Sequence, residues 1–476
     1  MKYRLRMEGV NILRFVADCK NLSVIRGGGL IILDAPDLLS KAGVLSGMTE
    51  VTKGASMAIY DFEARDDEAA NGVRDRVFDQ LNKSGELRHA TFVVDVVPKT
   101  GDFGLDREKL IALNRFRQMR SPSVAYRQTE SAESCGLDGV RPAEEEVDLK
   151  PPKSLSKATV VRRRYGIQQR QAIFKRVNED QQTPIQLPRF TDDLESLSSD
   201  SSKGNLHKKV AVIHIDGNGF GSIQAAKCRD EAKQSQFDKL VQGGRLGWLR
   251  EHLRTTIEEK DWLNGKEYRM EILVWGGDEV VAVVPAWQGW ALLSSYFRHS
   301  ASWAVFQGEK LTHAAGMVFC HHNAPIHTVT ALTRNLMERE AKAVSKTALN
   351  ENRNVFVYQV LESFDTLGSE IEQQRMRLCP GTEAEKAARR PLLCLKGADM
   401  DQIRDDLNTV RDSVPRHKLH ELLAIWGTGV MAAEVEKTLE KDPVKRHRTK
   451  WQGLKQKLGG APMCWLHLQE LWDFVG

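Results

Sequence analysis

Two glycine-rich segments carry the acidic side chains that could do chemistry. Asp216 follows the β-branched run at residues 209–215 and begins Asp-Gly-Asn-Gly-Phe-Gly, while Asp278 and Glu279 follow two glycines between two apolar runs. Carboxylate oxygens are preferred ligands of Mg²⁺ and Mn²⁺. If the strands that carry these acids are neighbours, the carboxylates converge on one side of a sheet. Two metal ions held there would serve nucleotidyl transfer, one activating a hydroxyl and the other holding the triphosphate.

The glycines beside these acids suit the same chemistry. Gly217, Gly219 and Gly221 let the backbone approach phosphates at a helix N-terminus, and Gly276 and Gly277 supply the tight turn that projects the acids. Each segment alone has an ordinary interpretation, since Asp-Gly-Asn-Gly is a common turn and Gly-Gly-Asp-Glu a solvated hairpin tip. Their order within one pattern of strands and helices favours the catalytic interpretation.

The elements around the acids follow the order strand, helix, strand, strand, helix, strand, which is typical of a ferredoxin-like unit. We expect strands at residues 209–215, 268–275, 280–284, 314–320 and 354–360, and helices at residues 237–258, 287–306 and 329–347. The last helix carries one polar face at steps of four, made of Arg334, Glu338, Lys342 and Lys346. That face is either ion-paired and solvated or turned toward a phosphate.

The first part of the chain repeats this order more faintly. We expect strands at residues 3–8, 48–53, 56–62 and 90–97, and helices at residues 11–22 and 67–82. The pattern indicates a degenerate internal duplication. Lys53-Gly54-Ala55-Ser56 stands where the second unit has Trp275-Gly276-Gly277-Asp278. The first unit therefore lacks the hairpin acids and is expected to be catalytically silent, completing a nucleotide pocket across the interface between the units.

Composition excludes several classes of protein. The 476 residues are 41% hydrophobic and 28% charged, as in soluble globular proteins. No apolar stretch approaches the ~20 residues of a membrane helix, and the charged opening does not fit a signal peptide, so we expect a cytoplasmic protein without membrane contact. A net charge of +5 is too small to indicate nucleic-acid binding. Seven cysteines without a CxxC pair argue against a disulfide framework and a zinc ribbon.

The motifs resemble those of a known family. IDGNGFG with WGGDE, followed by AAGMVFCHHNAPI and a helix that contains AK, resembles the palm domain of GGDEF diguanylate cyclases. It is more similar to the second palm of the large subunit of type III CRISPR effector complexes, whose signature is GGDD. MEGVNILRFVADCKNLSVIRGGGLII resembles that subunit's first palm, residues 135–143 its CxxC insertion in degenerate form, and residues 414–422 its C-terminal helical domain.

The resemblance implies a division of the chain and an α+β fold with two ferredoxin-like palm domains, an insertion and a C-terminal helical domain. The expected segments are residues 1–117, a degenerate first palm; 118–190, an insertion with the degenerate zinc-finger-like motif; 191–204, a linker; 205–378, the catalytic palm; and 379–476, the helical domain.

It also implies roles for individual residues. Asp216, Asp278 and Glu279 would be catalytic and would hold the metal together with the Gly217 carbonyl, and Lys342 would contact the triphosphate. The nucleotide-binding set would comprise Gly217, Asn218, Gly219, Phe220, Gly221, Gly276, Gly277, Lys342 and Lys346.

The sequence departs from the family pattern in several places. The motif is GGDE rather than GGDD, and glutamate still reaches a metal. Val280 replaces the phenylalanine of GGDEF enzymes and Gly221 their usual lysine, which weakens the diguanylate cyclase interpretation. Cys135 lacks its partner cysteine, so we expect no zinc there. The sequence has no His-Asp dipeptide, so an HD nuclease domain and its DNase activity are expected to be missing.

The expected function is that of a nucleotidyltransferase. With two Mg²⁺ or Mn²⁺ ions it would join nucleoside triphosphates, ATP favoured, into a cyclic oligonucleotide or dinucleotide second messenger in CRISPR-type or related antiviral defence. A non-enzymatic RNA-binding scaffold subunit and, more weakly, a diguanylate cyclase are the alternatives. RNA, other effector subunits and a second copy of the chain are the partners left open.

Overall fold

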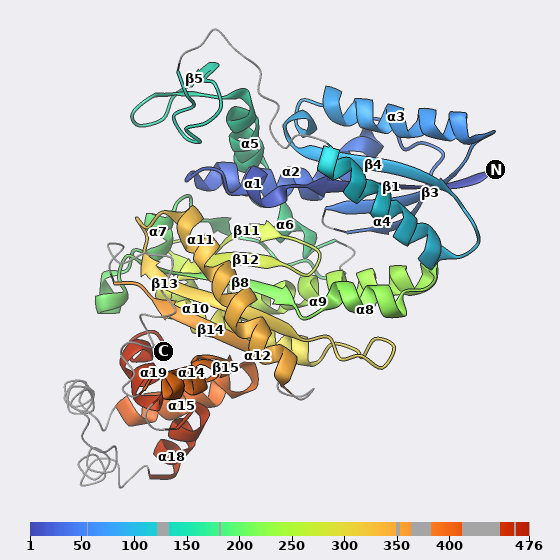
Figure 1. The fold of residues 1–476 in the computed structure, drawn as a ribbon. Coiled ribbons are helices and arrows are strands. Elements are labelled where there is room, and N and C mark those ends of the chain that lie inside the picture. The colour runs from blue at the N-terminus through green and yellow to red at the C-terminus, as the bar shows by residue number, and fades with distance from the viewer. Residues whose placement is uncertain are drawn as a thin grey trace.

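The computed structural model describes residues 1–54, 56–120, 133–179, 182–348, 353–362, 382–411, 448–460 and 463–475. Figure 1 shows two sheets one above the other, with an insertion beside the upper one and helices near the C-terminus below the lower one. This mixed architecture confirms the predicted α+β fold class. The exact domain limits stay a prediction, and the motif at residues 414–422 lies outside the described residues.

The upper sheet comes from the N-terminal part of the chain. Its strands are β1 (Lys2–Val10), β2 (Thr49–Lys53), β3 (Met57–Glu63) and β4 (Thr91–Pro98), in the order β2-β3-β1-β4 and all antiparallel. Its helices are α1 (Ile12–Val16), α2 (Leu22–Lys41), α3 (Asp67–Lys83), η1 (Leu87–His89) and α4 (Phe103–Arg120). This is the predicted order of elements, in which the first strand lies between the third and the last.

The lower sheet has six strands in the order β11-β12-β8-β13-β14-β15. These are β8 (Lys209–Gly217), β11 (Glu271–Trp275), β12 (Val280–Pro285), β13 (His313–His321), β14 (Val355–Val360) and β15 (Leu395–Lys396). Its helices are α8 (Phe220–Lys227), α9 (Glu231–Thr256), α10 (Ala286–Ala301), α11 (Ile326–Asn335), the π-helix η4 (Leu336–Ala341) and α12 (Lys342–Thr347). Strands β11-β12-β8-β13 repeat the order of the upper sheet, as expected for a duplication.

Apolar side chains on both faces of β8 bury this strand between two hydrophobic clusters. Ala211, Ile213 and Ile215 face a cluster formed with α9 and α10. Val210 and Val212 face the opposite cluster, which includes α11 and η4. Because side chains on a strand alternate between faces, β8 is buried on both sides, and the polar residues that interrupt its second face stand out.

The sequence prediction for the first long helix is wrong. We expected it at residues 11–22, but only the short α1 lies there and α2 begins at Leu22. The three consecutive glycines of α2, which resemble a turn, lie inside the helix. A Cβ on Gly27 would lie 1.8 Å from the Arg162 carbonyl oxygen, and a Cβ on Gly29 would lie 3.1 Å from that of Leu273. These glycines allow α2 to approach its neighbours closely.

The remaining elements join and cover the two sheets. Between the sheets in sequence lie β5 (Glu145–Val147), β6 (Lys153–Leu155), α5 (Lys157–Gln168), α6 (Ala172–Arg176), β7 (Arg189–Phe190), α7 (Leu194–Ser198) and η2 (Ser201–Leu206). The stretch predicted as a flexible linker thus contains two short helices, and Leu197 is buried. Further along come η3 (Lys260–Trp262), β9 (Leu263–Asn264), β10 (Glu267–Tyr268), α14 (Glu383–Arg389), η6 (Arg390–Leu393), η7 (Gly397–Asp399), α15 (Met400–Arg411), α18 (Arg448–Lys457) and α19 (Met463–Leu471). Among the described residues, none of the helices is long and apolar enough to cross a membrane.

Candidate active site

Strand pairing brings the predicted acids together. Strand β12 pairs antiparallel with both β11 and β8, with Val280 opposite Ile215, so the tip that precedes Val280 lies beside the end of β8. The Gly276 N–H donates to the Glu279 carbonyl oxygen at 2.7 Å and closes this tip. Asp216, Asp278 and Glu279 therefore meet at one end of the sheet, which is the arrangement that the sequence predicted.

Gly217 is the tightest point of this arrangement. A Cβ on Gly217 would lie 2.8 Å from Asp278 Oδ2 and 2.6 Å from the Phe220 ring, so only glycine fits. Gly219, with φ of 68°, is the left-handed residue before α8. Phe220 is buried and packs edge-on against Phe237. Phe220 was predicted to bind nucleotide, but its side chain faces the core and only its backbone is placed for that role.

Two of the other predicted glycines, Gly221 and Gly277, lie in open space. A Cβ on Gly221 or Gly277 would meet no atom within 4 Å, so neither is required by packing. Asn218 donates from its side chain to the Thr312 hydroxyl at 3.1 Å and to the Arg353 carbonyl at 2.9 Å, while its buried Oδ1 accepts no hydrogen bond. Asn218 thus ties the turn after β8 to the segments before β13 and β14.

The electrostatics of Asp278 and Asp216 are unusual. Burial, reinforced by the negative charge of Asp216, raises the pKa of Asp278 to about 7. Burial also raises the pKa of Asp216 above its ordinary value, although the ammonium group of Lys342 acts in the opposite direction. Burial, together with repulsion between neighbouring acids, makes the charged forms of these two carboxylates costly in free energy. A divalent cation bound beside them would stabilise the charged forms.

Lys342, the first residue of α12, contacts one of the acids. Its Nζ donates to Asp216 Oδ2, and it pairs with Glu338 at 3.1 Å. The predicted helix at residues 329–347 is interrupted by η4, whose wider turn ends where Lys342 begins α12. Gly316 on β13 lets this helix lie close to the sheet, because a Cβ there would be 2.0 Å from the Thr333 carbonyl oxygen. Lys346 is exposed in the next turn of α12.

Glu279 has a partner that sequence reasoning missed. The buried His214 contacts Glu279 Oε1 through Nε2 at 2.9 Å. Burial acts to raise the pKa of Glu279, but the hydrogen bond from His214 and the charges around it hold this pKa below its usual range. His214 lies two residues before Asp216 on β8, and this spacing is the sequence signal that could have identified it.

Arg245 on α9 is the second missed residue. Its guanidinium lies over the Trp275 ring, 4.9 Å from the ring centroid, and its Nη1 donates to the Glu279 carbonyl at 3.3 Å. Burial lowers the pKa of Arg245 to about 10. A basic residue at a distant point of a long helix gives no local signal, so only the tertiary structure places it behind the hairpin.

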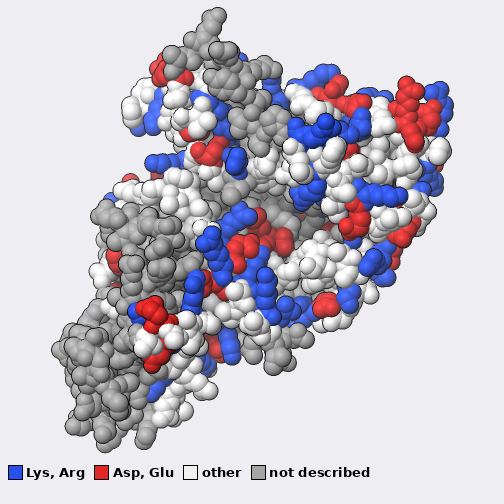
Figure 2. All heavy atoms as spheres, in the orientation of Figure 1, with Lys and Arg blue, Asp and Glu red and all other residues white. Residues whose placement is uncertain are grey.

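A cavity of about 230 Å³ opens beside this arginine, between the two palm units. From the first unit it is lined by Leu33 and Asp37 of α2 and by Lys53 and Gly54; from the second by Gln242, Arg245, Leu246 and Trp275; and from the α6 region by Arg176 and Glu179. Figure 2 shows Asp and Glu atoms surrounded by Lys and Arg atoms in the middle of this face. The predicted pocket across the interface thus has a structural counterpart.

The hydrogen bonds that close the two tips give the same alignment as the sequence. The Gly54 N–H donates to the Met57 carbonyl oxygen at 2.8 Å, as the Gly276 N–H does to that of Glu279 at 2.7 Å. Ser56 therefore takes the position of Asp278 and Met57 that of Glu279, so the first tip has no acidic residue. In this alignment Ala58 matches Val280, and Glu8 on β1 lies at the position of Asp216 on β8.

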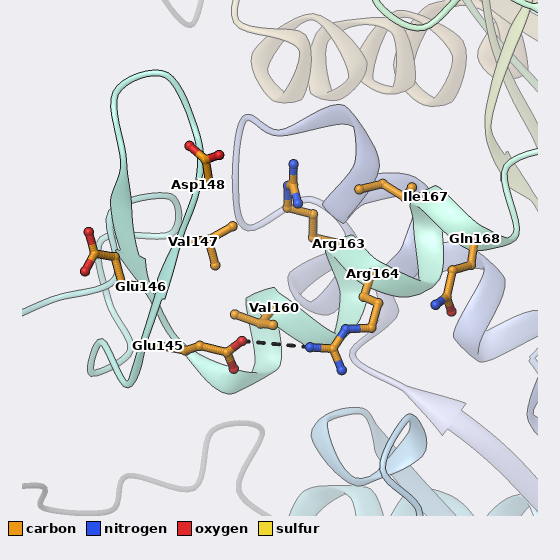
Figure 3. A pocket seen from close by; sticks show the side chains of 9 residues that line it. All are labelled: Glu145, Glu146, Val147, Asp148, Val160, Arg163, Arg164, Ile167 and Gln168. Atoms are coloured by element: carbon orange, nitrogen blue, oxygen red, sulfur yellow. Dashed lines mark ion pairs between the residues drawn. The ribbon is translucent and has the colours of Figure 1, made fainter.

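A larger cavity of about 360 Å³ lies in the insertion, away from the acids. Figure 3 shows it between the β5–β6 hairpin and α5, where Glu145 and Arg164 form an ion pair at 3.8 Å. Its lining combines three acids and two arginines with no residue of the predicted site. The smaller cavity also contains none of the predicted residues, but its lining includes Arg245 and Trp275, which lie against the hairpin that carries Asp278 and Glu279.

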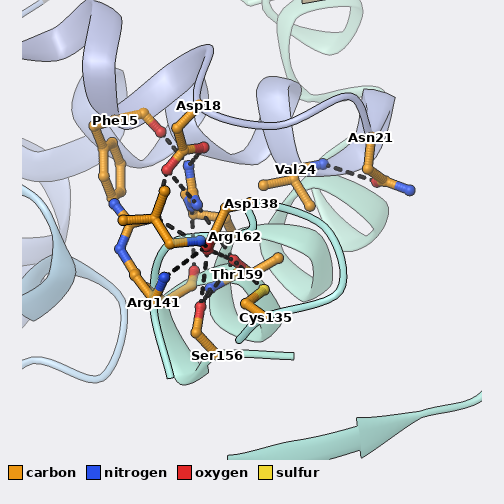
Figure 4. A network of polar contacts seen from close by, with 12 residues as sticks. Phe15, Asp18, Asn21, Val24, Cys135, Asp138, Arg141, Ser156, Thr159 and Arg162 are labelled. Carbon is orange, nitrogen blue, oxygen red and sulfur yellow. Dashed lines mark hydrogen bonds and ion pairs between the residues drawn. The ribbon is translucent and has the colours of Figure 1, made fainter. Parts of the chain in front are cut away.

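The degenerate zinc-finger-like motif is built around Asp138. Its carboxylate accepts from the N–H groups of Val140 and Arg141 and from the Thr159 hydroxyl, each at 2.9 Å (Figure 4). Burial acts to raise the pKa of Asp138, but these hydrogen bonds lower it to about 2. Arg141 then pairs with Asp18 of the first unit at 2.5 Å. Hydrogen bonds to the Asp138 carboxylate hold this region together, at the position where the resemblance led us to expect a second cysteine.

The acids do not form a complete metal site by themselves. In the part of the chain that the structure describes, no group of three or more His, Cys, Asp or Glu side chains could hold a metal ion. Lys342 and His214 each contact one of the acids. Mg²⁺ is usually held by one or two carboxylates plus substrate phosphates. Asp216 and Asp278 with the Gly217 carbonyl fit an ion that binds together with a nucleotide.

Comparisons with known proteins agree with this geometry. Residues 209–350 match the family model of Cas10/Cmr2, second palm domain. Csm1 in T. onnurineus is similar over 100% of this chain and 69% of its own, with 13% identity and a TM-score of 0.57. A Csm1-Csm4 cassette in complex with AMPPNP has 13% identity and a TM-score of 0.56 over 100% of this chain and 70% of that one. A cassette in complex with cA3 has 13% identity and a TM-score of 0.55 over 100% and 69%. No curated protein matches the chain.

Fold and site together define a palm-domain protein of the nucleotidyl-transferase type. More particularly, residues 209–350 match the Cas10/Cmr2 second palm domain, and the chain has the fold of Csm1. The resemblance to the large subunit of type III CRISPR effector complexes is thereby confirmed. The absence of an HD nuclease domain stays a prediction.

Proposed function

We propose that this protein joins nucleoside triphosphates, ATP favoured, through 3′–5′ bonds into a cyclic oligonucleotide or dinucleotide. One observation carries the proposal: Asp216 and Asp278, whose pKa values are both raised by burial, lie near each other at the end of β8, where Lys342 contacts Asp216, in a segment that matches the Cas10/Cmr2 second palm domain. This arrangement suits a cation and a triphosphate together. The nucleotide complexes of the similar Csm1-Csm4 cassettes support a nucleotide ligand and the choice of ATP.

Lys342 and the glycine turn are the groups that would bind the triphosphate. When phosphates approach, the Lys342 ammonium can transfer its contact from Asp216 to a phosphate oxygen, which frees that carboxylate for the cation. Gly217 and Gly219 keep the backbone at the start of α8 accessible to a phosphate. A bound pair of Mg²⁺ or Mn²⁺ ions would supply the acidity that activates the attacking hydroxyl and the charge that stabilises the leaving pyrophosphate.

Arg245 and Trp275 would shape the pocket beside the reacting groups. Their stacked arrangement is buried behind the hairpin and borders the cavity between the palm units. A second nucleotide seated in that cavity could present its hydroxyl toward the end of β8. The first palm would then contribute binding surface from α2 and its tip, without contributing a carboxylate at the Glu279 position.

The assembly context belongs to the same proposal. The similar structures are of a Csm1-Csm4 cassette, which favours a role for this chain beside another effector subunit. A non-enzymatic RNA-binding scaffold is the second candidate. It is supported by the same likeness of fold, but it leaves the two buried acids without a purpose.

The test is incubation of the purified chain with ATP, GTP or both, with Mg²⁺ or Mn²⁺ and with or without RNA, followed by mass spectrometry of the products. We expect a cyclic adenylate product that Asp278→Ala combined with Glu279→Ala abolishes. Absence of product under every condition would favour the scaffold, and product from GTP alone would favour a diguanylate cyclase. Product without RNA would indicate a stand-alone synthase.

A further inference from the structure

His214 is a polar residue on an otherwise apolar face of β8. Val210 and Val212 precede it on that face and belong to the cluster that includes Val329 and Leu336. His214 is 2% exposed. On β13 its cross-strand neighbour is Gly316, where α11 and η4 approach the sheet most closely. The imidazole therefore lies inside an apolar layer between the sheet and the helix that leads to Lys342.

Packing does not explain why a histidine lies there. Its Nδ1 is buried and has no hydrogen-bond partner, which costs free energy relative to an apolar side chain of similar size. The Nε2 atom has one partner, Glu279 Oε1, at 2.9 Å. An apolar residue at this position would remove the unpaired nitrogen and fit the surrounding valines. The contact with Glu279 is therefore the feature that requires a histidine.

The strand register explains why that partner is a glutamate. His214 lies opposite Val281 on β12, and Glu279 precedes Val281 by two residues, so the two side chains are diagonal neighbours on one face. Diagonal positions are about 7–8 Å apart and are bridged by long side chains. An aspartate at this position is shorter by one methylene, about 1.5 Å, and would not span the gap. The GGDE form of the motif thus matches a histidine two residues before Asp216.

We infer that His214 is a positioning residue that fixes the Glu279 carboxylate. The imidazole holds Oε1, which limits rotation of the carboxylate and leaves Oε2 to bind a cation at the end of β8. Hydrogen bonds to a metal-ligating carboxylate orient it, and their loss typically lowers metal affinity by roughly 10–100-fold. This inference rests on the proposed function, because it assumes that a cation binds at these acids.

The test uses the full chain and four variants: His214→Leu, His214→Gln, Glu279→Asp and the double variant His214→Leu/Glu279→Asp. Binding of Mn²⁺ in the presence of a non-hydrolysable ATP analogue is measured by electron paramagnetic resonance, as the loss of the signal from free Mn²⁺. Thermal unfolding without metal is measured in parallel. The binding measurement needs no turnover, so it separates this inference from the chemistry proposed above.

We expect His214→Leu to weaken Mn²⁺ binding by roughly 10-fold or more while leaving the midpoint of thermal unfolding unchanged or higher. His214→Gln should restore most of the binding, because its amide nitrogen can donate from nearly the same place. In the Glu279→Asp background, His214→Leu should have little further effect, because the contact is already lost.

Three results would overturn the inference. They are unchanged Mn²⁺ affinity in His214→Leu, equal losses in the Leu and Gln variants, and full additivity of His214→Leu with Glu279→Asp. If the unsubstituted protein binds no Mn²⁺ with the nucleotide analogue, the proposed function itself fails, which is a distinguishable outcome.

Discussion

The two palm sheets are built alike and differ in how their polar groups are balanced. Strands β1 and β8 are both nine residues long, and each pairs with a hairpin whose tip is closed by the same backbone hydrogen bond. Aligning the two hairpins places Glu8 of the first sheet at the position of Asp216, and Arg6 at the position of His214. The first sheet has kept the scaffold and one acid on its central strand, but it lacks the two hairpin acids.

Charges in the first sheet are neutralised inside the fold. Arg4 on β1 is fully buried and pairs with Asp61 at 2.8 Å and with Asp106 at 3.3 Å. Arg6 pairs with Glu8 at 2.6 Å. Each of these two cations has a carboxylate partner. In the second sheet three carboxylates lie near Lys342, His214 and Arg245, yet burial still raises the pKa of Asp216 and Asp278. Balanced charge stabilises the first unit, whereas the charged forms of two acids in the second are costly until a cation binds.

The largest expected effect is on chemistry in the second sheet. Asp216→Asn should lower the rate of nucleotide joining by roughly 10²–10³-fold, comparable to the loss of one strong electrostatic contact to a transition state. Asp75→Asn, on an exposed face of α3 in the first unit, is the matched control and should leave the rate unchanged. Product formation quantified by mass spectrometry checks both variants. Equal rates in all three proteins would contradict the assignment of the acidic end.

A smaller effect should follow from separating the sheet and the helix that carries Lys342. Gly316→Ala places a Cβ 2.0 Å from the Thr333 carbonyl oxygen, so the helix must move outward. We expect a loss of about 1–3 kcal/mol in unfolding free energy, together with reduced nucleotide binding as Lys342 moves away from Asp216. Urea unfolding and nucleotide titration measure the two effects.

The control is Gly72→Ala on α3, where a Cβ would meet no atom within 4 Å. Alanine stabilises an open helical position slightly. If Gly316→Ala behaves like Gly72→Ala, the close approach at β13 is not what positions the helix.

Removing one carboxylate from the ion pairs of the first sheet should lower the stability of the fold. Burial acts to raise the pKa of Asp61, but hydrogen bonds from Arg4 and Lys99 outweigh it and hold this pKa below its ordinary value. The carboxylate therefore stabilises the folded state above about pH 4, and this contribution is lost as the pH falls through the folded pKa. Asp61→Asn should cost about 2 kcal/mol at pH 7, since Arg4 would lose one of its partners inside the fold.

The same substitution should have little effect near pH 2, where Asp61 is protonated in the unfolded chain and increasingly so in the folded one. Urea unfolding at the two pH values checks this. A pH-independent cost would show that the contact acts through packing rather than charge.

Sequence reasoning identified the local features of the site and missed the long-range ones. The acids, the glycine turn and the strand order are encoded within short segments, so motif and periodicity were sufficient. The helix α2 was missed, and its glycines are explained only by the close approach of α5 and β11. Arg245 joins the site through the packing of α9, and the helix that carries Lys342 lies close to the sheet because Gly316 is on another strand. Such contacts leave no periodic trace in the sequence.

The smallest expected effect runs opposite to that of Asp61, and it tests the comparison most directly. Burial and the charge of Asp216 raise the pKa of Asp278 to about 7, above its value of about 4 in an unfolded chain. The protonated form is therefore favoured by folding, and its contribution to stability is present below about pH 4 and lost as the pH rises through 7. Without metal, Asp278→Asn should raise the unfolding free energy at pH 8 by about 1 kcal/mol, or ~2 °C in melting temperature, and change little at pH 4. Calorimetry in the presence of a chelator measures this. If Asp278→Asn lowers the melting temperature at pH 8 instead, the Asp278 carboxylate is stabilised by its surroundings, as that of Asp61 is. The distinction between the two sheets would then fail, because it rests on an acid whose charged form destabilises the fold until a cation binds.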